Sequence, residues 1–203
     1  MKLYNSIGPN PHVVRMFMAE RGVELRMEEI DLRGVENRRE PYLAKNPSGQ
    51  MPALELDDGT VLSEITAICE YLDETTPGMS LVGSNARERA ATRMWTRRID
   101  LNIVEPMVNG FRFAEGMKLF QNRIHTIPQA SADLKQVAQE NLAWLDKLMA
   151  GKTWICGDRF SLADIFLYAF LDFGAGVGQK FSPELKNIDA WFARMKARPS
   201  ATA

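Results

Sequence analysis

The first 75 residues alternate short apolar runs with longer helical patterns. Within residues 65–72, apolar side chains recur three, four and seven positions after Ile65, which is the spacing of one helix face. The turn sequence Asp57-Asp58-Gly59 separates two short apolar runs, a pattern typical of a β-hairpin. The predicted order is strand 2–5, helix 10–21, strand 26–32, a short helix from residue 40, strands 53–56 and 60–62, and helix 65–72. A parallel crossover followed by an antiparallel pair predicts a small mixed sheet with helices packed on it.

The first predicted helix has suitable residues at both ends. Asn10 suits the N-cap, and Pro11 suits the first helical position, where the N–H has no partner within the helix. Gly22 suits the C-terminal end.

The pattern changes near Thr76-Pro77-Gly78, which has the composition of a linker. Beyond it the apolar residues follow helical spacing only, and we expect Pro106 to kink or end the first of these helices. The spacing from Ser161 to Asp164 predicts a capping box at the start of another helix. We therefore predict an α/β domain at 1–77, a linker at 78–85 and an all-α domain at 86–203. The helical stripes lie at 91–99, 134–145, 161–173 and 188–195.

Composition narrows the function further. The 203 residues include 25 basic and 26 acidic side chains, and this balance argues against a nucleic-acid partner. No apolar run approaches the length of about 20 residues that spans a bilayer, and residues 1–6 do not resemble a secretory signal. Two lone cysteines, Cys69 and Cys156, suit a reducing cytoplasm, and both are expected to be buried. With only His12 and His125 as histidines, and no clustered ligands, we expect no metal site.

Four short motifs in order resemble the glutathione transferase family across nearly the whole chain. They are Lys2-Leu3-Tyr4 with Pro9-Asn10-Pro11, the segment NPSGQMPAL at 46–54, SEITAI at 63–68, and GDRFSLAD at 157–164. The resemblance implies a thioredoxin-like N-terminal domain that binds glutathione as a co-substrate. It also implies an all-helical C-terminal domain that holds the acceptor.

The resemblance also implies where glutathione binds. A cis Pro52 would turn the backbone of Met51 outward to pair with the cysteinyl part of the ligand. Glu64 is expected to face the ligand ammonium, and N–H groups at the helix start would hold its α-carboxylate. Ile65 replaces the serine usual in the family, and Thr66 is the neighbouring hydroxyl. The full predicted glutathione-binding set is Asn37, Gln50, Met51, Pro52, Glu64, Ile65 and Thr66.

The residue that stabilises the glutathione thiolate is expected in the loop before the first helix. This loop has no cysteine, and it aligns best with a bacterial branch of the family that has an asparagine at the position of Asn10. Asn10 is the predicted donor and Ser6 the second candidate. Tyr4 is expected to be a core residue, and His12 to be solvated.

Three functions stay open at this point. The first is transfer of glutathione to small hydrophobic electrophiles, and the second is a glutathione-dependent disulfide or peroxide reductase. The third function is a non-catalytic binding module. It stays open because Gly8 and Ile65 stand at positions where the family usually has hydroxyl side chains. The family also implies a homodimer formed through the helices at 65–72 and 91–99. Candidates for the acceptor pocket are Trp95, Arg98, Asn102, Phe111 and Phe113.

Overall fold

The computed structural model describes residues 1–203 and divides the chain into two units. The first unit consists of Met1–Ser84 together with Pro199–Ala203, and the second of Asn85–Arg198. No helix is long and apolar enough to cross a membrane.

The first unit is built on a four-stranded mixed sheet with the order β2-β1-β3-β4. Its strands are β1 (Lys2–Asn5), β2 (Arg26–Glu29), β3 (Ala53–Glu55) and β4 (Val61–Leu62). β1 pairs in parallel with β2 and antiparallel with β3, which in turn pairs antiparallel with β4. The predicted parallel crossover and terminal hairpin are therefore confirmed.

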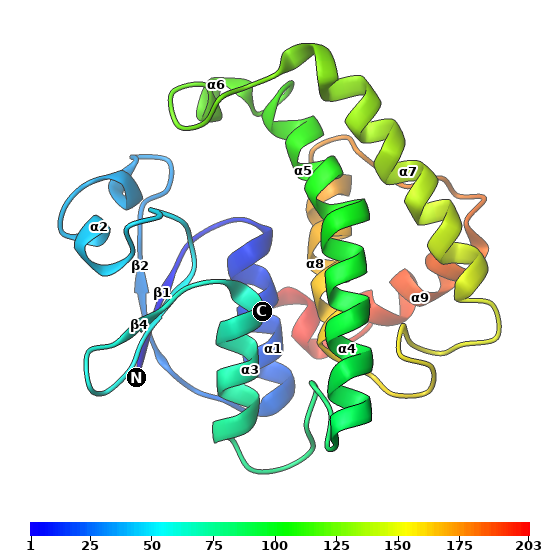
Figure 1. The fold of residues 1–203 in the computed structure, drawn as a ribbon, viewed down its shortest axis with the longest axis horizontal. Helices are drawn as coiled ribbons and strands as arrows, with labels where there is room; N and C mark the ends of the chain where they lie inside the picture. Colours follow the sequence, from blue (N-terminus) through cyan, green and yellow to red (C-terminus); the bar gives the residue numbers. More distant parts are fainter. The chain divides into compact units, whose positions relative to one another are not determined.

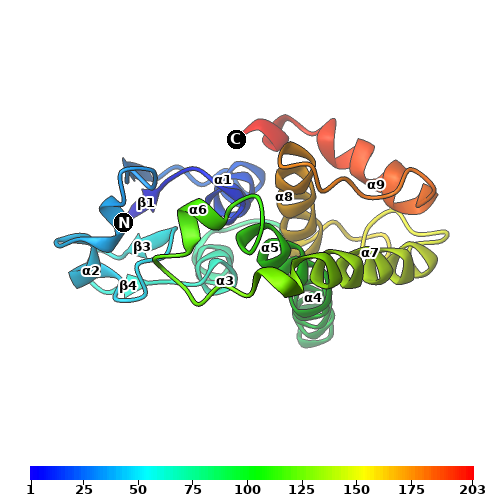
Figure 2. The ribbon, with the colours of Figure 1, turned by 90° about the horizontal axis from the view of Figure 1, so that it is seen from above.

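Helices cover both faces of this sheet (Figures 1 and 2). Helices α1 (Pro9–Arg21) and α3 (Ile65–Thr75) pack against each other on one face. The short helix α2 (Tyr42–Lys45) and the 3-10 turn η1 (Glu36–Arg38) lie on the other side. The ring of Tyr42 meets that of Tyr4 edge-on at 5.8 Å, and both are buried. Tyr4 is therefore a core residue, as predicted.

The start of the first helix and the end of the second strand differ from the prediction. Helix α1 begins at Pro9, with Gly8 as its N-cap, so Asn10 is the second helical residue and makes no capping hydrogen bond. The fixed φ of Pro9 suits the first helical position. The preceding Gly8 has a φ of 111°, which residues with a Cβ rarely adopt, so glycine suits the N-cap here. Strand β2 ends at Glu29, because Asp31 accepts the N–H of Gly34 and turns the chain.

The C-terminal ends of α1 and α3 are joined by a buried ion pair. Arg21 Nε lies 2.9 Å from Asp73 Oδ1, and each side chain is only 4% exposed. Arg21 also donates to the carbonyls of Thr76 and Met79. Asp73 accepts the N–H of Leu81 at 2.9 Å. The start of the segment predicted as a linker is thus fastened to both helices.

The last five residues return to the first unit, which differs from the predicted range 86–203. They include the 3-10 turn η4 (Pro199–Thr202), which packs on α1. The hydroxyl of Ser200 donates to Glu20, and His12 Nε2 lies 3.1 Å from the carbonyl oxygen of Ala201. His12 is therefore half-buried and not fully solvated as expected.

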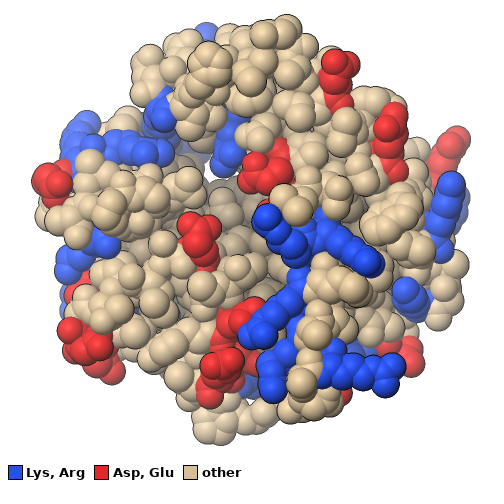
Figure 3. Space-filling model, in the orientation of Figure 1, with Lys and Arg blue, Asp and Glu red and all other residues tan.

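The second unit is built of helices, apart from a short β-bridged hairpin at residues 154–159. Pro106 follows a π-helical turn, η2, which separates α4 from α5, because a proline cannot donate to the preceding turn. Helix α4 carries five arginines, and Figure 3 shows basic side chains gathered over it. The elements are α4 (Ala86–Ile99), η2 (Asp100–Val104), α5 (Glu105–Arg112), α6 (Met117–Phe120), η3 (Pro128–Ala130), α7 (Ser131–Leu148), α8 (Leu162–Gly176) and α9 (Lys186–Lys196).

Helix α8 forms the core of this unit, and its buried start depends on Asp164. The predicted capping box with Ser161 is present. Asp164 Oδ1 accepts the N–H groups of Ile155 and Trp191 Nε1, both at 2.9 Å, and Oδ2 accepts the N–H and hydroxyl of Ser161 at 3.0 and 3.1 Å. Burial raises the pKa of Asp164 to about 6, although these hydrogen bonds act to lower it.

Asp164→Asn is expected to lower the free energy of unfolding by about 2–3 kcal/mol, because its amide NH₂ would face buried donors in place of an acceptor. Urea unfolding of the full chain measures the change. Asp158→Asn, an exposed change in the preceding turn, is the control. Equal unfolding midpoints for the two variants would contradict this role.

Candidate functional site

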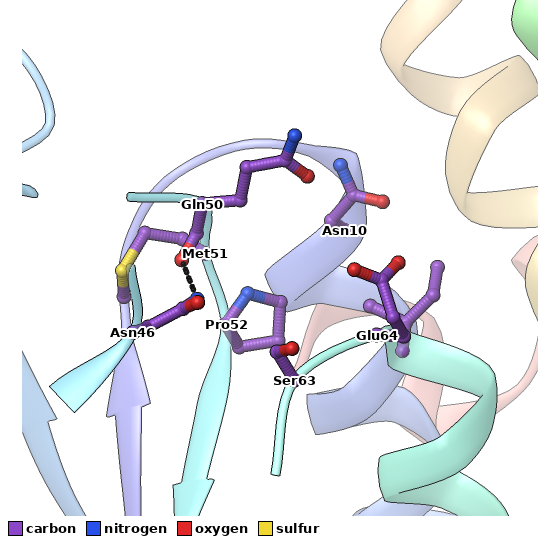
Figure 4. A pocket seen from close by; sticks show the side chains of 8 residues that line it. Asn10, Asn46, Gln50, Met51, Pro52, Ser63 and Glu64 are labelled. Atoms are coloured by element: carbon purple, nitrogen blue, oxygen red, sulfur yellow. Dashed lines mark hydrogen bonds between the residues drawn. The ribbon is translucent and has the colours of Figure 1, made fainter. Parts of the chain in front are cut away.

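A pocket opens in the first unit where α1 and α3 begin. Figure 4 shows that its side chains come from three segments: the first turn of α1, the loop before β3 and the start of α3. The lining residues are Asn10, Asn46, Gln50, Met51, Pro52, Ser63, Glu64 and Ile65.

The start of α1 presents few backbone donors to this pocket. Pro9 and Pro11 have no N–H, and the N–H of His12 bonds the carbonyl of Gly8 at 3.2 Å. Only Asn10 therefore contributes a free N–H from the first turn. The Asn10 side chain, which has no partner within the protein, adds an amide NH₂ beside it.

The start of α3 offers more unpaired backbone N–H groups than the start of α1. The first intrahelical bond runs from Ile68 to the carbonyl of Glu64 at 2.9 Å, so the N–H groups of Ile65, Thr66 and Ala67 have no partner in the helix. With the helix dipole, these groups favour a negative charge here. The arrangement fits a carboxylate.

Glu64 places a carboxylate beside these donors. Its φ of 69° is uncommon for a residue with a Cβ, and it lies directly before the first residue of α3. The side chain is exposed and forms no ion pair within the protein. A positively charged group in the pocket would therefore find an unpaired partner.

The peptide bond between Met51 and Pro52 is cis, as the resemblance implied. The N–H and C=O of Met51 form no hydrogen bond within the protein and remain available to an extended ligand. The preceding loop is held in place by three side chains. Tyr42 and Asn46 donate to the carbonyl of Gln50 at 2.6 and 2.9 Å, and Asn37 donates to that of Gly49 at 2.6 Å.

The structure separates the predicted residues into lining and supporting positions. Asn10, Gln50, Met51, Pro52, Glu64 and Ile65 line the pocket. Asn37 is 2% exposed and supports the loop from behind. Thr66 does not line the pocket, and its backbone N–H has no partner within α3. Sequence reasoning missed Asn46 and Ser63, although both lie inside the quoted motifs 46–54 and 63–68.

Ser6 lies outside the pocket lining. Its side chain is 4% exposed, and its hydroxyl donates to the carbonyl of Ile30 at 2.7 Å. The hydroxyl proton is thus committed to holding the β1–α1 loop beside the end of β2.

Neither cysteine lines the pocket. Cys69 is fully buried on α3, and burial raises the pKa of its thiol well above the ordinary range. Cys156 lies in the second unit and is partly exposed, which corrects the expectation that it is buried.

The five acceptor candidates form two groups in the second unit. Trp95 lies under the guanidinium of Arg98 at 5.3 Å, and Asn102 donates to the Arg98 carbonyl at 2.8 Å. Phe111 lies in the last turn of α5, and the buried Phe113 follows directly after this helix. At a rise of about 1.5 Å per residue, the 16 positions from Trp95 to Phe111 span about 24 Å. One small ligand therefore cannot contact both Trp95 and Phe111.

Phe111 belongs to an aromatic cluster. Its ring meets Phe173 at 5.2 Å and Phe120 at 6.3 Å, both edge to face. Arg112 and Arg123 lie against the Phe120 ring at 5.5 and 5.8 Å.

Two family models match the chain. One, described as glutathione S-transferase, N-terminal domain, matches residues 7–75, and the other, glutathione S-transferase, C-terminal domain, matches residues 114–199.

Individual relatives extend over nearly the whole chain. Glutathione S-transferase 2 of Saccharomyces cerevisiae is 33% identical over 95% of this chain and 84% of its own length. Maleylacetoacetate isomerase of Pseudomonas aeruginosa is 32% identical over 94% of this chain and 86% of its own length. A crystal structure of a glutathione S-transferase domain-containing protein from Marinobacter aquaeolei VT8 superposes with a TM-score of 0.91, at 36% identity, covering 99% of this chain and 100% of that one.

Proposed function

Since the chain belongs to the glutathione S-transferase family, we propose that it binds reduced glutathione in the pocket between the starts of α1 and α3. There it activates the thiol as a thiolate for attack on small hydrophobic electrophiles. The observation that carries this proposal is the set of unpaired groups in one pocket: the Glu64 carboxylate, the free N–H groups of α3 and the backbone of Met51.

These groups complement the charges of glutathione. Glu64 supplies the negative charge for the ammonium of the γ-glutamyl end, and the N–H groups of Ile65 and Thr66 hold the neighbouring carboxylate. The Met51 backbone pairs with the cysteinyl unit as an added strand would. The supporting hydrogen bonds from Asn46, Tyr42 and Asn37 keep that loop in position before the ligand arrives.

Asn10 is the proposed donor to the sulfur. Because two prolines leave the first turn of α1 with a single free N–H, the backbone supplies less stabilisation of a thiolate than an ordinary helix start. The unpartnered amide of Asn10 adds a donor at this position. Ser6 is the weaker candidate, since its hydroxyl is buried and donates to Ile30.

The acceptor side rests on the cluster around Phe111, whose aromatic faces suit a small hydrophobic electrophile. Transfer is favoured over a thiol–disulfide mechanism through the protein, because no cysteine lines the glutathione pocket. The two free cysteines support placing the protein in the cytoplasm.

The function is tested by assaying the chain with glutathione against an aryl halide, a peroxide and a disulfide. We expect turnover of the aryl halide. Glu64→Gln should raise the KM for glutathione about tenfold, because an ion pair becomes a neutral contact, with little change in melting temperature. Cys69→Ala is the control and should keep its turnover. Glutathione binding without turnover of any acceptor would favour the non-catalytic module, and turnover of the disulfide or peroxide alone would favour the reductase.

The thiolate donor is tested by the ultraviolet thiolate absorbance of bound glutathione against pH. Asn10→Ala should raise the pKa of the bound thiol by about 1 and slow turnover near neutral pH, because one donor to the charged form is lost. Ser6→Ala should leave that pKa in place. The reverse pattern would assign the role to Ser6, and no change in either variant would assign it to backbone N–H groups.

We also propose that the chain forms a homodimer, as is general in the family, and that the surface of Trp95, Arg98 and Trp144 takes part. Trp144 is 41% exposed and its ring lies 6.3 Å from that of Trp95. Val137 and Leu148 share its exposed face of α7 at helical spacing. Apolar side chains gathered beside the arginines of α4 suit burial against a second copy.

Sedimentation should give the mass of two chains at micromolar concentration. Trp144→Glu should shift the protein towards the monomer, because a charge would be buried in the interface. Leu119→Glu, at an exposed apolar position on α6, should leave the mass unchanged. A single-chain mass for the wild type at all concentrations would overturn the proposal.

A further inference from the structure

A second cleft lies in the second unit and shares no residue with the glutathione pocket. It is formed by the first turns of α4 and the hairpin before α8, and its volume of about 460 Å³ is within the range of small-molecule sites. The lining residues are Asn85, Arg87, Glu88, Ala91, Cys156 and Arg159.

The hairpin fixes a thiol beside a guanidinium. Trp154 and Gly157 exchange two backbone hydrogen bonds of 2.7 and 2.9 Å around a tight turn, and Cys156 stands opposite Arg159 in an antiparallel bridge. Residues paired in this way direct their side chains to the same face. Cys156 is partly exposed, and the hydroxyl of Ser161 donates to its Sγ at 3.4 Å.

The charges of the cleft are two positive and one negative. Arg87 is exposed and forms no ion pair within the protein. Arg159 is anchored to α4, because its Nη2 donates to the carbonyl of Glu88 at 3.2 Å and to Thr92 at 2.6 Å, and its Nη1 is buried. The carboxylate of Glu88 and the exposed amide of Asn85 complete the polar lining.

The cleft thus combines two guanidinium groups, one carboxylate and one thiol. These groups complement a small peptide that carries two carboxylates, one ammonium group and a sulfur. We propose that the cleft binds a disulfide of this class, glutathione disulfide being the matching example, and that Cys156 exchanges with it to form a mixed disulfide. Arg87 and Arg159 attract the carboxylates.

The exchange is balanced without a further oxidant. The Cys156 thiolate attacks one sulfur of the bound disulfide, and a new S–S bond forms to Sγ as the original S–S bond breaks. The other half leaves as a thiolate and takes up the proton that Cys156 gave up. Cys156 is oxidised, and the departing half is reduced to its thiol.

The test measures the rate at which the full chain gains one adduct, by intact mass under non-reducing conditions, with three disulfides of different charge. These are glutathione disulfide, neutral hydroxyethyl disulfide and cationic cystamine. We expect glutathione disulfide to react fastest and cystamine slowest, with peptide mapping placing the adduct on Cys156. Cys156→Ser should abolish the adduct.

Charge variants separate this cleft from the general effect of an arginine-rich helix. Arg87→Ala should slow the reaction with glutathione disulfide about fivefold and leave the neutral reagent unaffected. Arg97→Ala removes the same charge from the same helix outside the cleft, and should change neither rate. Equal effects of the two variants, equal rates for the three reagents, or an adduct on Cys69 would each overturn the proposal.

Discussion

The buried ion pair between Arg21 and Asp73 fixes the two helices that form the proposed glutathione pocket. Both side chains are almost fully buried, and loss of either would leave an uncompensated charge in the interior. The pair joins the C-terminal ends of α1 and α3, while the pocket occupies their N-terminal ends. Each helix is rigid along its length, and α1 and α3 pack against each other. The ion pair at their C-terminal ends therefore helps to set the distance between the N–H donors at their N-terminal ends.

The two helix starts that face each other across the pocket differ in chemistry. Helix α3 offers three unpaired N–H groups, whereas the prolines of α1 leave only one. A helix that is poor in backbone donors needs a side chain to supply them, and Asn10 stands at that place. The shortage of backbone N–H donors at the start of α1 is therefore a physical reason to propose Asn10 as the donor, in addition to the resemblance of its loop.

Much of the fold followed from local patterns, because strand alternation, helix spacing and the hairpin turn act over short distances. The mixed sheet, the capping box at Ser161 and the break at Pro106 are of this kind. The docking of Pro199–Ala203 on α1 was missed, since it depends on contacts between residues 180 and 189 positions apart in the sequence. Within the site, Asn10 and Glu64 were identified by motif, but the burial of Ser6 and the two-part division of the acceptor candidates depend on tertiary packing that no short motif encodes.

The return of the last five residues to the first unit has a consequence for synthesis. The first unit is discontinuous, since the second unit is inserted between Ser84 and Pro199. On a ribosome, the N-terminal segment emerges early, but the piece that covers His12 and Glu20 arrives only after the whole helical unit, on the order of ten seconds later. During that interval α1 stands partly uncovered in the nascent chain. Completion of the first unit is therefore tied to translation of the second, so that the two units mature together.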